Sequence, residues 1–174
     1  FAAHGWATRK RENRVWIAEM APDARALGEL VAADLGRAYD TPWPDEAVRV
    51  DVVAYAGPAG AYVTLEPLHV RIAASEPRSS GHSGLEVLFH EVSHGLVEKL
   101  KDALDEACAR HHKQAPPDLW HAMVFFTTGE ILARRLPGHE PQADRMALYQ
   151  DDWRALPAIL AAHWRPFLRG EGAW

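Results

Sequence analysis

The sequence predicts an α+β fold. A small, mostly antiparallel sheet of three to four strands is expected to pack on the helix that carries the candidate site. Two or more helices follow that helix. Apolar and polar residues alternate around residues 48–52, as in half-buried strands. Beyond residue 84 the apolar residues recur every three to four positions, as in helices. A length of 174 residues suits one domain. We therefore expect a single domain over 1–174, with a helix and sheet part at 15–75 and a helical part at 84–165.

The first predicted element is an amphipathic helix over residues 22–39. Pro22 suits the first position of a helix, where its missing N–H is not needed. Apolar residues then follow at helical spacing: Leu27, Leu30, Val31 and Leu35. The segment 41–44, Thr-Pro-Trp-Pro, ends this helix.

The sheet is predicted from three short segments. Valines alternate with charged residues at 48–52, and two further strands are expected at 61–65 and 69–73, after the turn at 57–60. The connections are short, which favours antiparallel pairing.

The second half of the chain is predicted to be helical. Ser83 and Glu86 have the spacing of a capping box, so we expect a long helix to begin near Gly84. A second helix is expected from the cap at Asp118 to Arg135. A last helical stretch follows residue 141, with Pro157 as an expected kink.

Composition excludes several classes of protein. The 24 acidic residues outnumber the 19 basic ones, which is the opposite of the balance that neutralises nucleic-acid phosphates, so we expect no nucleic-acid partner. No apolar run approaches the roughly 20 residues that a bilayer requires, so no membrane span is expected. The single cysteine, Cys108, cannot form an internal disulfide or a thiolate metal cage. Cytoplasmic and periplasmic or secreted locations both fit, and the oligomeric state is left open.

One five-residue segment carries specific chemistry. His90, Glu91 and His94 form the pattern His-Glu-x-x-His inside a predicted helix. Histidines at i and i+4 lie one turn apart on the same face and can hold one zinc ion. Glu91 is rotated away from this pair and can act as general base toward an activated water. The residues around the motif are almost all uncharged, so burying these groups without a partner such as a metal would be costly.

The segment 87–96 resembles the active-site helix of zincin metallopeptidases. This resemblance implies a peptidase that depends on Zn²⁺, in which His90 and His94 bind the metal and Glu91 activates the water that attacks a peptide bond. The metzincin subgroup continues to a third histidine, but Val97 and Leu100 stand at the corresponding positions. The resemblance therefore points to the gluzincin type, in which a glutamate from a following helix completes the ligand set.

Glu130 is the candidate for that glutamate. It is the only charged residue within 122–133, and a buried carboxylate there requires a cation. Gly129 beside it would let two helices approach closely. Glu98 and Glu106 lie too far along the helix of the motif to reach the same ion. Thermolysin-like enzymes have Asn and Asp near this glutamate, whereas Gly129 and Arg134 stand here, so the exact family is unassigned.

His121 is the rival of Glu130. Nine residues separate the two, which places them on opposite faces of a regular helix. His121 can therefore act as a third ligand in place of Glu130, or as the hydrogen-bond donor that holds the developing oxyanion. Tyr149 competes for the role of donor.

The strand at 60–64 precedes the motif and is expected to border the cleft. In zincins this edge pairs with an extended substrate, so a peptide or protein substrate is the expected partner, although an ordinary edge strand is an equal interpretation. Two other functions stay open. One is a catalytically inactive zincin-like metal-binding or interaction domain. The other is a different zinc amidohydrolase of the deformylase kind, against which the downstream position of Cys108 weighs.

Overall fold

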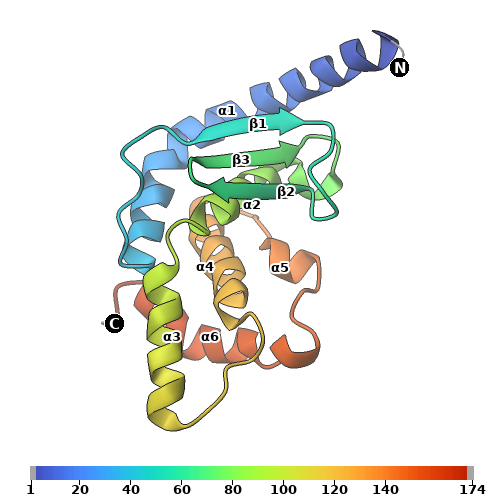
Figure 1. Ribbon diagram of the computed structural model, residues 1–174. Helices are drawn as coiled ribbons and strands as arrows, with labels where there is room; N and C mark the ends of the chain where they lie inside the picture. Colours follow the sequence, from blue (N-terminus) through green and yellow to red (C-terminus); the bar gives the residue numbers. More distant parts are fainter. Residues whose placement is uncertain (1–2, 172–174) are drawn as a thin grey trace.

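The first helix is longer than its periodicity predicts. The computed structural model describes residues 3–171. Helix α1 runs over Ala3–Ala38 without a break at Pro22, so the predicted start at residue 22 is wrong. Trp16 and Met20 are buried, and the indole N–H of Trp16 donates to the carbonyl of Ser79. These tertiary contacts add to the favourable helix propensity of the Ala-, Arg- and Glu-rich segment before the proline, which has no clear apolar periodicity. The N-terminal end of α1 projects beyond the sheet (Figure 1).

The sheet has three strands in the order β1–β3–β2. These are β1 (Arg49–Val53), β2 (Ala61–Leu65) and β3 (Leu68–Ala73), each close to its predicted position. β2 pairs antiparallel with β3, whereas β1 pairs with β3 in parallel. The sheet is therefore mixed, and the expectation of mostly antiparallel pairing is wrong. Short connections favour antiparallel pairing between sequence neighbours, but β1 and β2 are not neighbours here, because the β2–β3 hairpin places β3 between them.

The helical half is divided more finely than predicted. It comprises α2 (Gly81–Ser93), α3 (Glu98–His111), α4 (Leu119–Arg135), α5 (Gln142–Arg145) and α6 (Leu156–Leu168). Single 3₁₀ turns lie at Pro77–Ser79 and Asp151–Trp153.

Two predicted details of these helices are wrong. Ser83 lies inside α2, whose N-cap is Ser80, so Ser83 and Glu86 do not form the expected capping box. Pro157 lies in the first turn of α6, where proline is tolerated, and not at a kink.

Helix α2 lies at the centre of the molecule. The sheet covers one of its sides, through contacts with β2 and β3, and α1 and α4 pack on the others (Figure 1). The core that joins these elements contains fully buried side chains from α1, β3, α2 and α4: Leu35, Ile72, Leu85, Val124 and Ile131. This packing brings the C-terminal end of α2 close to the N-terminal half of α4, and the site is built there.

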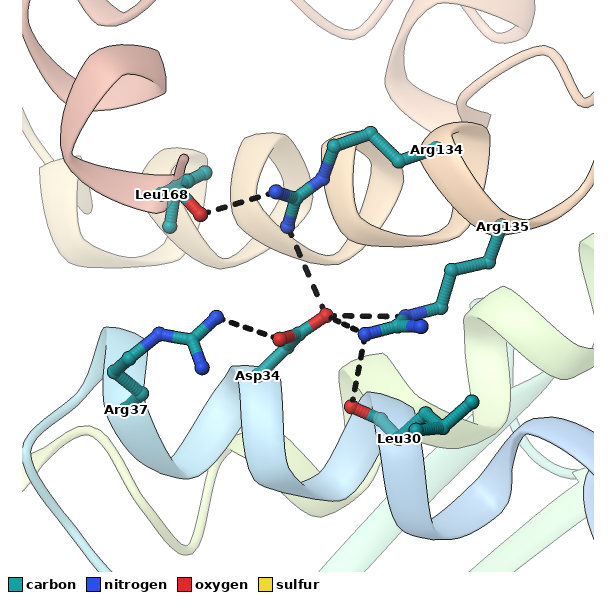
Figure 2. A network of polar contacts seen from close by, with 6 residues as sticks. All are labelled: Leu30, Asp34, Arg37, Arg134, Arg135 and Leu168. Atoms are coloured by element: carbon teal, nitrogen blue, oxygen red, sulfur yellow. Dashed lines mark hydrogen bonds and ion pairs between the residues drawn. The ribbon is translucent and has the colours of Figure 1, made fainter. Parts of the chain in front are cut away.

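A buried carboxylate connects α1 to α4 at some distance from that site. Asp34 on α1 is paired with Arg37 of its own helix at 2.6 Å and with Arg135 of α4, whose Nε donates at 3.0 Å. Arg134 approaches Asp34 to 3.8 Å and donates to the carbonyl of Leu168 at the end of α6 (Figure 2). The carboxylate thus connects α1 to α4, and Arg134 extends the network to α6.

Candidate functional site

The motif residues lie at the C-terminal end of α2. Leu85, Phe89 and Val92 are buried in the core, and His90 is buried beside them. His94 is the C-cap of the helix, and Gly95 closes the turn by donating its N–H to the carbonyl of Val92 at 3.0 Å. The expected long helix therefore ends at the motif, and α3 starts separately at Glu98.

His121 comes to the same place from the first turn of α4. Asp118 takes a left-handed conformation just before this helix, and its carbonyl accepts the N–H of His121 at 2.9 Å. The Nε2 atom of His90 lies 3.0 Å from Nε2 of His121 and 3.2 Å from Nε2 of His94. Within the described part of the chain, these three residues are the group of metal-binding type whose ligand atoms all lie within 4.8 Å of one another.

The three imidazoles fit a single metal ion. Nitrogens bound to zinc at 2.0–2.1 Å in a tetrahedral arrangement lie about 3.3 Å apart, close to the two separations given above. A ring nitrogen carries either one hydrogen or one lone pair, so Nε2 of His90 cannot make a good hydrogen bond to both neighbours. A cation between them would satisfy all three lone pairs at once.

Burial and the neighbouring imidazoles favour the neutral form of these histidines. Burial lowers the pKa of all three, and it lowers the pKa of His94 to about 4. The neighbouring imidazoles lower the pKa values of His90 and His94 further, because a second positive charge is unfavourable there. Metal binding needs the neutral form of histidine, so the ligands are available at neutral pH.

Aromatic side chains hold the imidazole rings in place. Trp120 stacks on His121 with 5.1 Å between ring centroids, and it meets His94 edge-on at 5.5 Å. Phe125 lies 4.1 Å from the ring of His90 and 4.8 Å from that of His121. These contacts limit the rotamers of the three histidines, which favours a preformed site.

Glu91 shares a cavity of about 320 Å³ with the histidines. Its carboxylate is not one of the converging ligand atoms. Burial raises its pKa from an ordinary value near 4.5 to about 7. A carboxylate with a pKa near neutrality is suited to taking up a proton and giving it back.

The same cavity is bordered by the edge strand β2, through Ala61 and Tyr62. β2 pairs with β3 on one side only, so its other edge has no strand partner in the described sheet. The expected position of the 60–64 strand beside the histidine motif is confirmed.

Glu130 is not part of the histidine group. Its two carboxylate oxygens accept hydrogen bonds from Nη2 and Nε of Arg165 on α6, each at 2.7 Å. The carboxylate does meet a cation, as its uncharged surroundings predict, but that cation is a guanidinium. Of the two alternatives that the helix geometry leaves open, the structure brings His121 to the motif and turns Glu130 away.

Tyr149 also lies outside the histidine cavity. Its side chain borders a separate pocket together with Glu130 and Arg165, and its hydroxyl donates to the carbonyl of Ala122 at 3.4 Å. Its burial raises the pKa of the phenol well above the usual range.

Sequence reasoning missed a second group of buried polar residues behind the motif. Glu86 lies one turn before His90 and is almost fully buried. It is paired with Nε2 of His139 at 2.8 Å and accepts the backbone N–H of Gln142 at 2.9–3.0 Å. Glu86 is the other carboxylate in the uncharged surroundings of the motif, and this isolation indicates that it is buried and paired. Nothing in the sequence indicates which residues are its partners.

Comparisons of the chain with protein-family models, with curated proteins and with solved structures find no match. In the part of the chain that the structure describes, every helix is too short or too polar to cross a bilayer.

Proposed function

We propose that this protein is a zinc-dependent peptidase whose metal ligands are His90, His94 and His121. The observation that carries the proposal is that three imidazole Nε2 atoms converge in one cavity that also contains Glu91. The open edge of β2 beside that cavity supports an extended peptide as the substrate, because such an edge can pair with an added strand.

The proposed ligand set differs from the gluzincin pattern. His121 takes the place that the resemblance assigns to a glutamate, and Glu130 is left to its ion pair with Arg165. Three neutral imidazoles leave the net charge of a zinc ion at +2. Held by these three residues, the ion would polarise the scissile carbonyl and would make water a better nucleophile near neutral pH.

Glu91 has the role of general base and acid. It removes a proton from the attacking water as that water adds to the carbonyl carbon. It then delivers the proton to the leaving amine, so that its carboxylate is regenerated. Burial raises the pKa of Glu91 in the metal-free protein, and a bound cation would favour its ionised form, which is the form that accepts the proton.

The first prediction concerns Glu91→Gln. This variant keeps the size of the side chain and removes the proton acceptor, so hydrolysis of unfolded, fluorescently labelled casein should fall at least about 100-fold. Zinc content should stay at the wild-type level, because Glu91 is not a ligand. Glu106→Gln, an exposed change on α3, serves as the control.

EDTA should abolish the wild-type activity, and added zinc should restore it. Turnover by Glu91→Gln at the wild-type rate would contradict the role of Glu91. A wild-type protein that binds zinc but cleaves no peptide bond would instead be a non-catalytic metal-binding domain.

A further inference from the structure

The developing negative charge on the scissile carbonyl oxygen needs a hydrogen-bond donor, and neither residue expected for this role is available. His121 is committed to the histidine group, and Tyr149 lies in another pocket. Stabilising an oxyanion with a fixed donor contributes substantially to hydrolysis of this type. Another polar side chain that borders the cavity can supply this donor in addition to the metal ion.

Three further polar side chains border it: Tyr62, Arg78 and Gln142. Tyr62 is 41% exposed and lies under the guanidinium of Arg71. Arg78 is partly exposed, and its Nη1 donates to a backbone carbonyl at 3.3 Å. Gln142 is only 6% exposed. A donor is most effective where water is excluded, which favours Gln142.

The backbone of Gln142 is held firmly against α2. Its N–H donates to both oxygens of Glu86, a residue of the same helix that carries His90 and Glu91. Glu86 is fixed in turn by His139. Gln142 thus has a defined position relative to the catalytic helix, although it belongs to a segment some 50 residues further along the chain.

The side chain of Gln142 keeps unused donor capacity. Its Nε2 contacts Sδ of Met146 at 3.6 Å, and Met146 borders the same cavity. A thioether is a weak acceptor, whereas a carboxamide has two N–H groups to donate. A buried amide with only this weak contact would form a stronger, charge-assisted hydrogen bond to a negatively charged oxygen within reach.

We propose that the carboxamide of Gln142 donates a hydrogen bond to the oxygen of the scissile carbonyl and is a further catalytic residue of this site. This inference rests on the proposed peptidase function. It gives α5, a single turn of helix, a direct part in the reaction.

The test uses Gln142→Met and Gln142→Leu, which remove the donor and preserve most of the volume. With casein peptides whose cleavage sites have been mapped, kcat should fall about 100-fold while KM changes little. Zinc content and thermal unfolding should stay at wild-type levels. Gln150→Met, at an exposed position of the same segment, should leave kcat unchanged.

A second readout does not depend on turnover. A phosphonate peptide that matches a mapped cleavage site should bind the zinc-loaded variants about 100-fold more weakly in calorimetry, while the ordinary product peptides bind unchanged. If both variants fold, bind zinc and keep kcat and phosphonate affinity within about threefold of wild type, the role of Gln142 is refuted and the peptidase proposal stands. If the wild-type protein itself has no peptidase activity, both proposals fail together.

Discussion

Glu91 and the three histidines respond to the same cavity in opposite ways. Burial raises the pKa of the carboxyl to about 7 and lowers the pKa values of the imidazoles, so all four groups are driven toward their neutral forms. Neutral histidines are ready to bind a cation. The ionised form of Glu91 is destabilised by burial in the metal-free protein, and a nearby positive charge would stabilise it.

This cost should be measurable in the metal-free protein. The unfolded chain releases the Glu91 proton near pH 4.5, and the folded chain releases it near pH 7. Between these values the folded state binds more protons, so its stability falls as the pH rises, and the loss is complete above about pH 7. Glutamine has no such proton. We therefore compare the free energy of unfolding of metal-free Glu91→Gln with that of the metal-free wild type. The difference between them, variant minus wild type, should be about 1–3 kcal/mol larger at pH 8 than at pH 5.

Urea unfolding at the two pH values, with EDTA present, measures this difference. Glu106→Gln is the control, because its exposed carboxylate predicts no such pH dependence. A Glu91→Gln stability difference that is the same at pH 5 and pH 8 would contradict the desolvation of Glu91.

Some residues of the candidate site could be predicted from the sequence, and others could not. The motif itself was predictable, because two histidines one helical turn apart in uncharged surroundings need a partner such as a metal when they are buried. The third member was not, because the cation that Glu130 requires is supplied by Arg165, 35 residues further along the chain. Periodicity did indicate that Glu130 and His121 could not both face the site, but only tertiary packing decides between them.

At the level of elements, the approach of α4 to the region behind the motif depends on Gly129. A Cβ atom at this position would lie 2.7 Å from Cβ of Pro141 and 3.2 Å from Oε1 of Glu86. Gly129→Ala would therefore push against the segment that carries Gln142 and against the buried Glu86–His139 pair. The close contacts at Gly129 are with Pro141, the residue before α5, and with the side chain of Glu86.

Gly129→Ala should lower the free energy of unfolding by about 1–3 kcal/mol, the usual cost of overpacking. Gly28→Ala is the matched control, since a Cβ there meets nothing within 4 Å and α1 should gain up to about 1 kcal/mol. Chemical denaturation of both variants makes the comparison. Equal stability of the two would show that the gap between α4 and residue 141 is not tight.

Element boundaries were predicted where local signals determine them. Strand β2 follows the turn at 57–60, as predicted, and the end of α4 at Arg135 is determined by the Leu-Pro-Gly segment that comes next. The separation of α2 from α3 was missed, because apolar periodicity continues through the turn at Gly95–Val97. The parallel pairing of β1 was missed for a related reason, since strand order is decided by the whole sheet and not by the length of one connection.

At the scale of the whole molecule, Asp34 connects α1 to α4, and Arg134 of the same network connects α4 to the end of α6 (Figure 2). Asp34→Asn removes the charge that Arg37 and Arg135 share and should destabilise the protein by about 2 kcal/mol, the usual range for a hydrogen bond to a charged group. Thermal unfolding measures the loss, with the exposed Asp102→Asn as control. Zinc content should not change, and zinc loss by Asp34→Asn at temperatures where it is folded would contradict a purely structural role.

The most direct test of the central claim is the zinc content of His121→Ala beside that of Glu130→Ala. Both proteins would be purified with one equivalent of zinc, passed over a desalting column and analysed by mass spectrometry of the metal. We predict about one zinc per chain for wild type and for Glu130→Ala, and a clear loss of zinc for His121→Ala. Retention of zinc by His121→Ala together with its loss from Glu130→Ala would overturn the three-histidine site.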